Sequence, residues 1–360
     1  MKKYQTTAKY KDKHQRLSIK RHRRELISKE KRKKKRYRNQ GKSKYQRVQE
    51  SLATGYTTLT APQHFSFIEE PERTIKFINK LENLYLKRKS VFVDLQNIQS
   101  LDHSAVAVLV SVMFSFKSRN IAFNGNFPLK KELSKILIDS GFFKYLSKPI
   151  GNKIEYTIGK ENQIFARANK EVNSELGLIV MAEASTTIWG ANRTCKGLQR
   201  TLLELMQNTN NHADLEEKGA KHWWLSVNHD KKSKKVSFYF VDYGVGIFES
   251  LKSKPSGNKW FGWFEKLKNK LQYGGNDEIL RLLLNGDMHM TVTGQHFRGK
   301  GLPGIKEVLD RNQISNLRII SNNVYADVGK EKFFKLSNEF SGTFVTWELN
   351  ENNINAKWII

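Results

Sequence analysis

Residues 203–213, LELMQNTNNHA, are the stretch that decides the fold of this chain. On a helix, Glu204 and Asn208 of this stretch lie four residues apart and therefore share one face. Two strand candidates follow at residues 222–228 and 235–242, and the KKSK spacer between them is typical of a hairpin tip. The second strand carries apolar residues at alternate positions. The sequence therefore predicts a helix that bears two polar groups and leads into a β-hairpin.

Glycine-rich motifs occur at two later points in the chain. The second strand runs directly into DYGVGI at residues 242–247, which places an acid at the end of a strand before a Gly-x-Gly turn. Another motif, GKGLPGI at residues 299–305, opens a predicted helix. Its Gly-x-Gly-x-x-Gly pattern also occurs in Rossmann dinucleotide sites, but there the glycines directly follow the first strand of a βαβ unit. Here the motif lies deep in the chain, so a Rossmann site is not indicated.

These motifs, together with the strand candidate SGTFVTW at residues 341–347, resemble the GHKL superfamily of ATPases, which includes histidine kinases, gyrase, Hsp90 and MutL. The resemblance covers about residues 165–350 and rests on the order of the motifs along the chain. It implies an α/β sandwich that binds ATP and Mg²⁺. Before the motifs, residues 161–213 are mostly helical in composition, and Gly177 and Gly190 divide them into two or three predicted helices.

The resemblance assigns roles to the polar residues of the first two motifs. Asn208 would hold Mg²⁺ against the phosphates, and Glu204 would be the base that polarises a water or a protein hydroxyl. One amide oxygen can suffice for Mg²⁺, because this ion relies on phosphates and waters for its other ligands. Asp242 would accept a hydrogen bond from the adenine amino group, and Gly244 and Gly246 would let the backbone approach the base.

The third motif would hold the phosphates of the nucleotide. The resemblance assigns this role to the amides of Gly299, Gly301 and Gly304 and to the helix N-terminus, with Lys300 adding positive charge. In the last strand, Thr343 would reach the adenine.

The interval between the two glycine motifs, about residues 248–298, corresponds to the lid that closes over ATP in this superfamily. Trp260, Phe261, Trp263 and Phe264 give the interval an apolar cluster. We interpret this cluster as lid packing or as a surface for a protein partner.

Residues 60–155 have a separate α/β pattern. Strand candidates at residues 91–95 and 121–124 alternate with helix candidates at residues 105–116 and 129–139. This order predicts parallel strands joined by right-handed crossovers.

Within this segment, VFVDLQNIQSLDHSAVAVLVSV resembles the strand, turn and helix of the STAS domain, the fold of the anti-sigma-factor antagonists. The turn here is Asp102-His103-Ser104-Ala105, in which His103 stands where the antagonists have their phosphorylated serine and Ala105 replaces a glycine. Two interpretations remain: Ser104 or His103 accepts a phosphate, or Asp102 or Ser104 caps the following helix. Without its phosphoacceptor, a STAS-like segment is best interpreted as a module that docks a protein partner.

Basic residues are concentrated in an N-terminal arm, residues 1–55. Residues 1–50 contain 21 Lys or Arg and four acids, which gives +17 of the net charge of +28. The arm is predicted to be disordered or helical and to become ordered on a polyanion. We interpret residues 1–48 as a contact for DNA or RNA. A ribosome-adhering tail or a contact with an anionic membrane is the alternative.

The composition of the whole chain limits the remaining possibilities. Its 360 residues suffice for two or three domains. The single cysteine, Cys195, excludes an intramolecular disulfide framework and a cysteine-based zinc site. No run reaches the roughly 18 apolar residues of a membrane span, and no apolar stretch follows the basic N-terminus as in a secretory signal. We therefore expect a soluble, cytoplasmic protein without a membrane span.

The sequence also narrows what the ATP is used for. No histidine occurs between His103 and His212, so the phosphoacceptor helix of a sensor histidine kinase is not expected. Gyrase, MutL and Hsp90 relatives need a further domain, yet only about ten residues follow Asn350. We expect an ATP/Mg²⁺-dependent switch with ATPase activity, whose lid controls a partner or homodimer surface. The alternatives are an anti-sigma-like Ser/Thr kinase acting on a STAS-type partner, and a nucleotide-binding scaffold without turnover.

Overall fold

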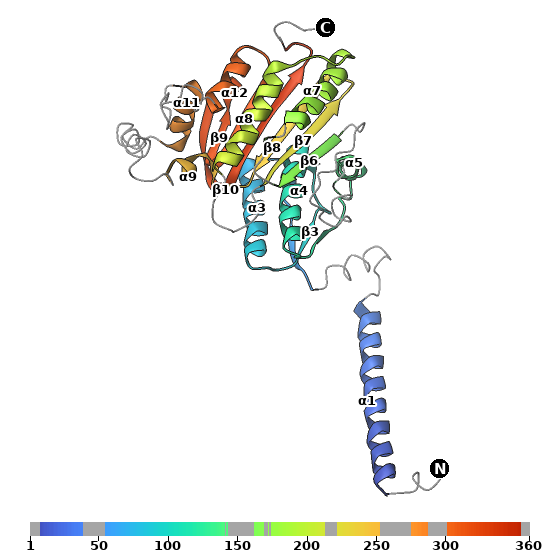
Figure 1. Ribbon diagram of the computed structural model, residues 1–360. Coiled ribbons are helices and arrows are strands. Elements are labelled where there is room, and N and C mark those ends of the chain that lie inside the picture. The colour runs from blue at the N-terminus through green and yellow to red at the C-terminus, as the bar shows by residue number, and fades with distance from the viewer. Residues whose placement is uncertain are drawn as a thin grey trace. The chain divides into compact units, whose positions relative to one another are not determined.

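The computed structural model describes residues 8–38, 55–140, 142, 162–168, 172, 174–212, 222–252, 275–286 and 301–353. The chain divides into two compact units, Met1–Gly55 and Tyr56–Ile360. The larger unit is an α/β structure, as predicted, and contains two main sheets (Figure 1).

The first unit contains one long helix, α1, at Ala8–Arg38. Neither proline nor glycine interrupts its 31 residues. Within this helix are 16 Lys or Arg and three acids. Two apolar side chains of α1, Leu17 and Ile27, are exposed.

The larger unit begins with a three-stranded parallel sheet. Its order is β1 (Thr57–Thr60), β3 (Val91–Asp94) and β5 (Phe123–Gly125). Three helices accompany it, namely α3 at Pro71–Leu86, α4 at His103–Ser118 and α5 at Lys131–Asp139. A two-stranded parallel pair, β2 (His64–Phe65) and β4 (Ser100–Leu101), completes this part. The predicted strands, helices and parallel pairing are confirmed, whereas α3 and β1 were not predicted.

The second sheet has five antiparallel strands in the order β6-β7-β8-β10-β9. The strands are β6 at Asn162–Ala168, β7 at His222–Asp230, β8 at Lys235–Asp242, β9 at Ser315–Asp327 and β10 at Lys332–Asn350. A short 3-10 helix, η2 (Val328–Lys330), joins the last two strands in sequence. The predicted hairpin of β7 and β8 is confirmed.

The helical composition predicted for residues 161–213 was wrong at its start. Residues 162–168 form β6, because β7 offers them an antiparallel partner. Gly177 does not divide the block either, since it lies inside α7 (Ser174–Trp189), where its position leaves open space. Gly190 does end this helix, with a positive φ of 71°. The described residues of this block therefore form one strand and two helices, the second being α8 (Lys196–His212).

Helices cover one face of the five-stranded sheet. Besides α7 and α8, this layer contains α9 at Gly246–Lys252, α11 at Asn276–Asn285 and α12 at Gly301–Asp310 (Figure 1). The core between the layer and the sheet includes Phe238, Phe240 and Trp347.

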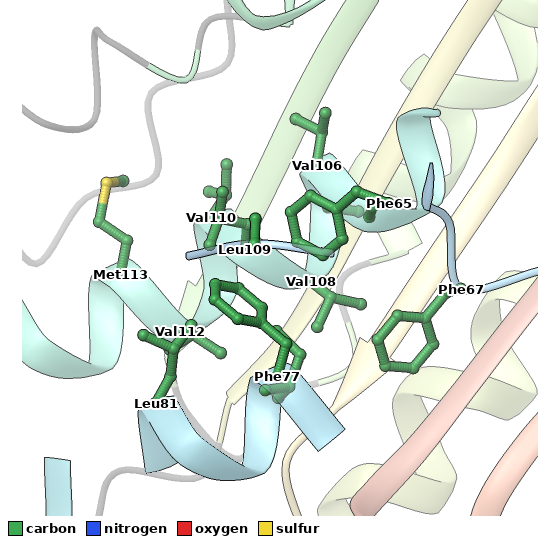
Figure 2. Packing of buried hydrophobic residues seen from close by; sticks show 14 of the residues in the cluster. Phe65, Phe67, Phe77, Leu81, Val106, Val108, Leu109, Val110, Val112 and Met113 are labelled. Carbon is green, nitrogen blue, oxygen red and sulfur yellow. The ribbon is translucent and has the colours of Figure 1, made fainter. Parts of the chain in front are cut away.

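The opposite face of the same sheet is covered by α3 and α4. Trp224, Tyr239 and Val241 of the sheet belong to the same buried cluster as the apolar residues of these helices. Figure 2 shows Phe77 and Leu81 of α3 packed beside the apolar side chains of α4. Residues predicted as two domains thus share one core, and the second sheet is buried on both faces.

Candidate functional site

The position of the second motif, residues 242–247, follows from the alternation of side chains along β8. Phe238 and Phe240 face the helical layer, whereas Tyr239 and Val241 face α3 and α4. By the same alternation, Asp242 at the end of the strand points to the side of α8. The Thr209 side chain of α8 lies near the Asp242 carboxyl group and lowers its pKa, which agrees with this direction. Strand β8 therefore places Asp242 beside α8, the helix that contains most of the first motif.

Among the described residues, the Asp242 carboxyl group has fewer hydrogen-bond donors around it than its oxygens can accept. Its Oδ1 is buried and has no hydrogen-bond partner among the described residues. Burial raises the pKa of Asp242 to about 7, although the nearby Thr209 side chain opposes this shift. The Thr209 hydroxyl donates its single proton to the backbone oxygen of Leu205 at 3.2 Å, so it does not satisfy Asp242 at the same time. Asp242 can accept a further hydrogen bond.

The last strand lies directly against this acid. In the β8–β10 register, Thr343 pairs with Asp242. Gly342 has a φ of 138°, and a Cβ there would lie 2.1 Å from the Asp242 backbone oxygen. Only glycine fits this position without displacing the strand. On the other side, a Cβ at Gly244 would lie 3.5 Å from Asp242 Oδ2, so glycine leaves the carboxyl group uncovered.

Two residues of β9, Ser321 and Asn322, hold the glycine turn in place. Ser321 Oγ accepts the amide proton of Ile247 at 2.9 Å and lies 3.0 Å from Thr343 Oγ1. Asn322 Oδ1 accepts from the amide of Phe248 at 3.2 Å, while its Nδ2 donates to the Val245 carbonyl at 3.0 Å. Together these bonds fasten the turn after Asp242 to the neighbouring strand.

Ser321 and Asn322 were not among the site residues predicted from the sequence. A usable signal existed, because the polar run Ser-Asn-Asn interrupts the otherwise apolar stretch IISNNVYA. Asn322 also has a positive φ of 47°, and it lies so close to Gly246 that a Cβ at that glycine would be 2.3 Å from Asn322 Oδ1. Gly246 is therefore required by the contact with β9.

The third motif meets the first through close packing of α12 on α8. A Cβ at Gly301 would lie 2.8 Å from the Asn208 amide nitrogen. One turn further, a Cβ at Gly304 would lie 2.7 Å from the Arg200 guanidinium. Arg200 in turn bonds to Glu307 of α12 at 2.8 Å. The glycines of the third motif therefore allow α12 to approach α8, and Asn208 lies at the N-terminus of α12.

Glu204 lies one turn before Asn208 on α8 and is partly buried. Burial raises the pKa of its carboxyl group, and the positive charge of Arg200 partly offsets that shift. A carboxyl group with a raised pKa accepts protons more readily than an ordinary one near neutral pH.

Several predicted site residues lie outside the described part of the chain. These are Gly299, Lys300 and, within the predicted lid, residues 253–274 and 287–298, which include the four aromatic residues Trp260, Phe261, Trp263 and Phe264. The described part of the predicted lid contains most of α9 and all of α11.

The turn at residues 102–105, which the sequence analysis compared with the STAS domain, forms a helix cap. Asp102 accepts the amide proton of Ala105 at 3.0 Å, and the hydroxyls of Ser66 and Ser104 donate to the same carboxylate. Ser104 is fully buried and also bonds to the amide of Phe67. Burial lowers the pKa of His103 to about 4. Ser104 is thus inaccessible to a kinase in this structure.

The described residues contain no metal site made of several protein ligands. Among them, no three His, Cys, Asp or Glu side chains gather in a metal-binding cluster. No helix in the described ranges combines the length and apolarity that a bilayer crossing requires.

Comparison of the sequence with protein-family models and with curated proteins gave no match.

Proposed function

We propose that residues 165–350 bind ATP and Mg²⁺ in the manner of a GHKL ATPase. The observation that carries the proposal is the buried Oδ1 of Asp242, which finds no hydrogen-bond donor in the part of the chain that the structure describes. An adenine amino group is such a donor. A guanine would present a carbonyl oxygen instead, and two acceptors would then face each other.

The surroundings of Asp242 support the same proposal. Thr209 joins the acid to α8, and Asn208 on that helix lies against Gly301 at the start of α12. Asn208 would supply an amide oxygen to Mg²⁺, and the N-terminal amides of α12 would face the phosphates. The bound metal ion would neutralise phosphate charge.

The proposed activity is slow ATP hydrolysis that drives a switch. Glu204 would act as the base for an attacking water, which its raised pKa favours. Lid closure over the nucleotide would create a surface for a protein partner or a second copy of the chain. The burial of Ser104 favours this proposal over a kinase whose own STAS-like turn is the acceptor.

Calorimetric titration with MgATP and MgGTP tests the binding step. We expect MgATP to bind and MgGTP to bind at least about tenfold more weakly. Asp242→Asn should lose MgATP binding, whereas Asp310→Asn, which changes an exposed acid paired with Lys306, should not. Failure of the wild-type chain to bind MgATP would refute the proposal.

A second experiment distinguishes hydrolysis from phosphotransfer. With γ-labelled ATP, the wild type should release free phosphate, and Glu204→Gln should bind MgATP but release none. Label transferred to the chain or to an added STAS-type protein would support the kinase alternative. Binding of MgATP without release or transfer of phosphate would support the remaining alternative, a nucleotide-binding scaffold without turnover.

We also propose that the basic arm contacts nucleic acid. The specific observation is α1, whose 31 residues carry 16 Lys or Arg and three acids. All side chains of α1 whose burial is described are exposed, so they are available to phosphates.

A further inference from the structure

The segment of β10 that precedes Gly342 lacks regular support from its own sheet. Its pairing with β9 shifts register between Lys335 and Phe340 and again between Phe340 and Thr343. A strand with two such irregularities is held less firmly by ladder hydrogen bonds. The sheet holds Gly342 and Thr343 through β8 and Ser321, but the residues before them depend on contacts from outside the sheet.

Helix α3 provides these contacts through one of its faces. Glu72 accepts hydrogen bonds from the backbone amides of Ser337 and Asn338. Asn79 donates to the Glu339 carbonyl at 2.9 Å. The spacing of seven residues between Glu72 and Asn79 places both side chains on the same helical face.

Glu82 lies three residues after Asn79 on α3. The Ser341 side chain lies near its carboxyl group and lowers its pKa, while Glu82 Oε1 is buried and has no hydrogen-bond partner among the described residues. Burial raises the pKa of Glu82 to about 7. A buried carboxyl group with an oxygen that lacks a hydrogen bond is costly to the fold, and a positioning role would account for it.

Tyr243 links the same region to the backbone of Asp242. Its hydroxyl lies 3.2 Å from Ser111 Oγ of α4, and its ring packs edge-on against Phe340 at 5.8 Å. Burial raises the pKa of this hydroxyl, and the nearby charge of Glu82 raises it further. Residues 242 and 243 therefore face opposite layers, the acid toward α8 and the tyrosine toward α3 and α4.

We infer that α3 is a positioning element of the proposed adenine site and that Glu82 is its positioning residue, acting through Ser341 and Gly342 on Asp242. The inference rests on the proposed function and extends it, because it makes the STAS-like segment part of the nucleotide site. Displacement of α3 would loosen the adenine end of that site and leave the α8–α12 end in place.

The test compares Glu82→Ala, Glu82→Gln and, as a control on an exposed acid of α5, Glu132→Ala. Two probes are titrated: MgATP, which needs both ends of the site, and magnesium tripolyphosphate, which needs only the phosphate end. Glu82→Ala should weaken MgATP binding on the order of tenfold and leave tripolyphosphate binding unchanged. Glu82→Gln keeps a partner for Ser341 and should stay within about twofold of the wild type.

Hydrogen exchange without nucleotide gives an independent measurement. In Glu82→Ala, amides of residues 339–345 should exchange faster, while those of α12 should not. The inference is overturned if a folded Glu82→Ala binds MgATP like the wild type, or if it loses affinity for both probes equally. If the wild type binds neither probe, the proposed function fails, and the exchange rates alone then decide whether Glu82 positions the segment.

Discussion

Asp242 is the residue at which stability and the proposed function oppose each other. Burial raises its pKa from the ordinary 3.8 to about 7. Between these values the folded chain keeps a proton that the unfolded chain has lost. The group therefore stabilises the fold most below about pH 4, and this contribution disappears as the pH rises to about 7. A donor from the nucleotide would compensate for what the protein does not supply.

We accordingly expect Asp242→Asn to stabilise the nucleotide-free protein. At pH 8 its free energy of unfolding should exceed that of the wild type by roughly 1–3 kcal/mol, because a neutral amide replaces a buried carboxylate. At pH 5 the difference should be smaller, since the wild-type acid is then protonated. Urea unfolding at both pH values measures this.

Glu82 must be controlled for, because its pKa is also raised to about 7. Glu82→Gln should remove a second part of the pH dependence, and the double variant should have the flattest profile between pH 5 and pH 8. A pH-independent difference between the wild type and Asp242→Asn would contradict this account.

Asn322 gives a second prediction at the residue scale. Asn322→Gly fits the positive φ of this position but removes both side-chain hydrogen bonds to the glycine turn. It should lower the free energy of unfolding by about 1–2 kcal/mol and weaken MgATP binding. Asn120→Gly is the matched control, because Asn120 has a similar φ of 56° but is exposed. Equal effects of the two changes in urea unfolding would show that the turn contacts do not matter.

At the scale of elements, the packing of α12 on α8 gives a prediction about Gly301. In Gly301→Ala the new methyl group would meet the Asn208 side chain, whose amide nitrogen would be only 2.8 Å away. We expect MgATP affinity to fall on the order of tenfold with the fold retained. Titration with ATP in the presence and absence of Mg²⁺ measures this, and the affinity of Gly301→Ala should fall below that of the wild type only when Mg²⁺ is present.

Gly177→Ala is the control for this change. The position lies inside α7 and leaves open space for a methyl group, so the variant should gain about 0.5–1 kcal/mol of stability from helix propensity. Its MgATP affinity should not change. Loss of affinity in both variants would mean that helix rigidity, and not the contact with Asn208, determines binding.

The elements that the sequence predicted are those whose signal is local. Strand β8 was predicted from alternating apolar residues, and the cap at Asp102 from its place before an apolar helix. Strand β6 was not predicted, because its strand state depends on pairing with β7. The bonds of Asn322 to the turn at Val245 join residues far apart in sequence, so only the fold reveals them.

On the scale of the larger unit, the α3 and α4 layer changes the meaning of the predicted domain pattern. A sheet with helices on one face only would leave Tyr239 and Val241 open to solvent, but both belong to the core shared with α4. Removing residues 60–155 should therefore expose this face, so a partner that binds these residues would act on a layer of the proposed nucleotide-binding unit itself.

The basic arm belongs to the scale of the whole molecule. Helix α1 has a net charge of +13 along about 46 Å, and duplex DNA presents a phosphate about every 1.7 Å of its axis. If six or more phosphates are contacted, the binding constant for duplex DNA or RNA should fall about 10³-fold or more between 50 and 200 mM salt. Fluorescence anisotropy at several salt concentrations measures how steeply the binding constant falls with salt.

Deleting residues 1–48 should flatten this salt dependence and leave MgATP affinity unchanged, because Tyr56–Ile360 is a compact unit of its own. Affinity that is insensitive to salt, or to the deletion, would show that the arm does not bind phosphates.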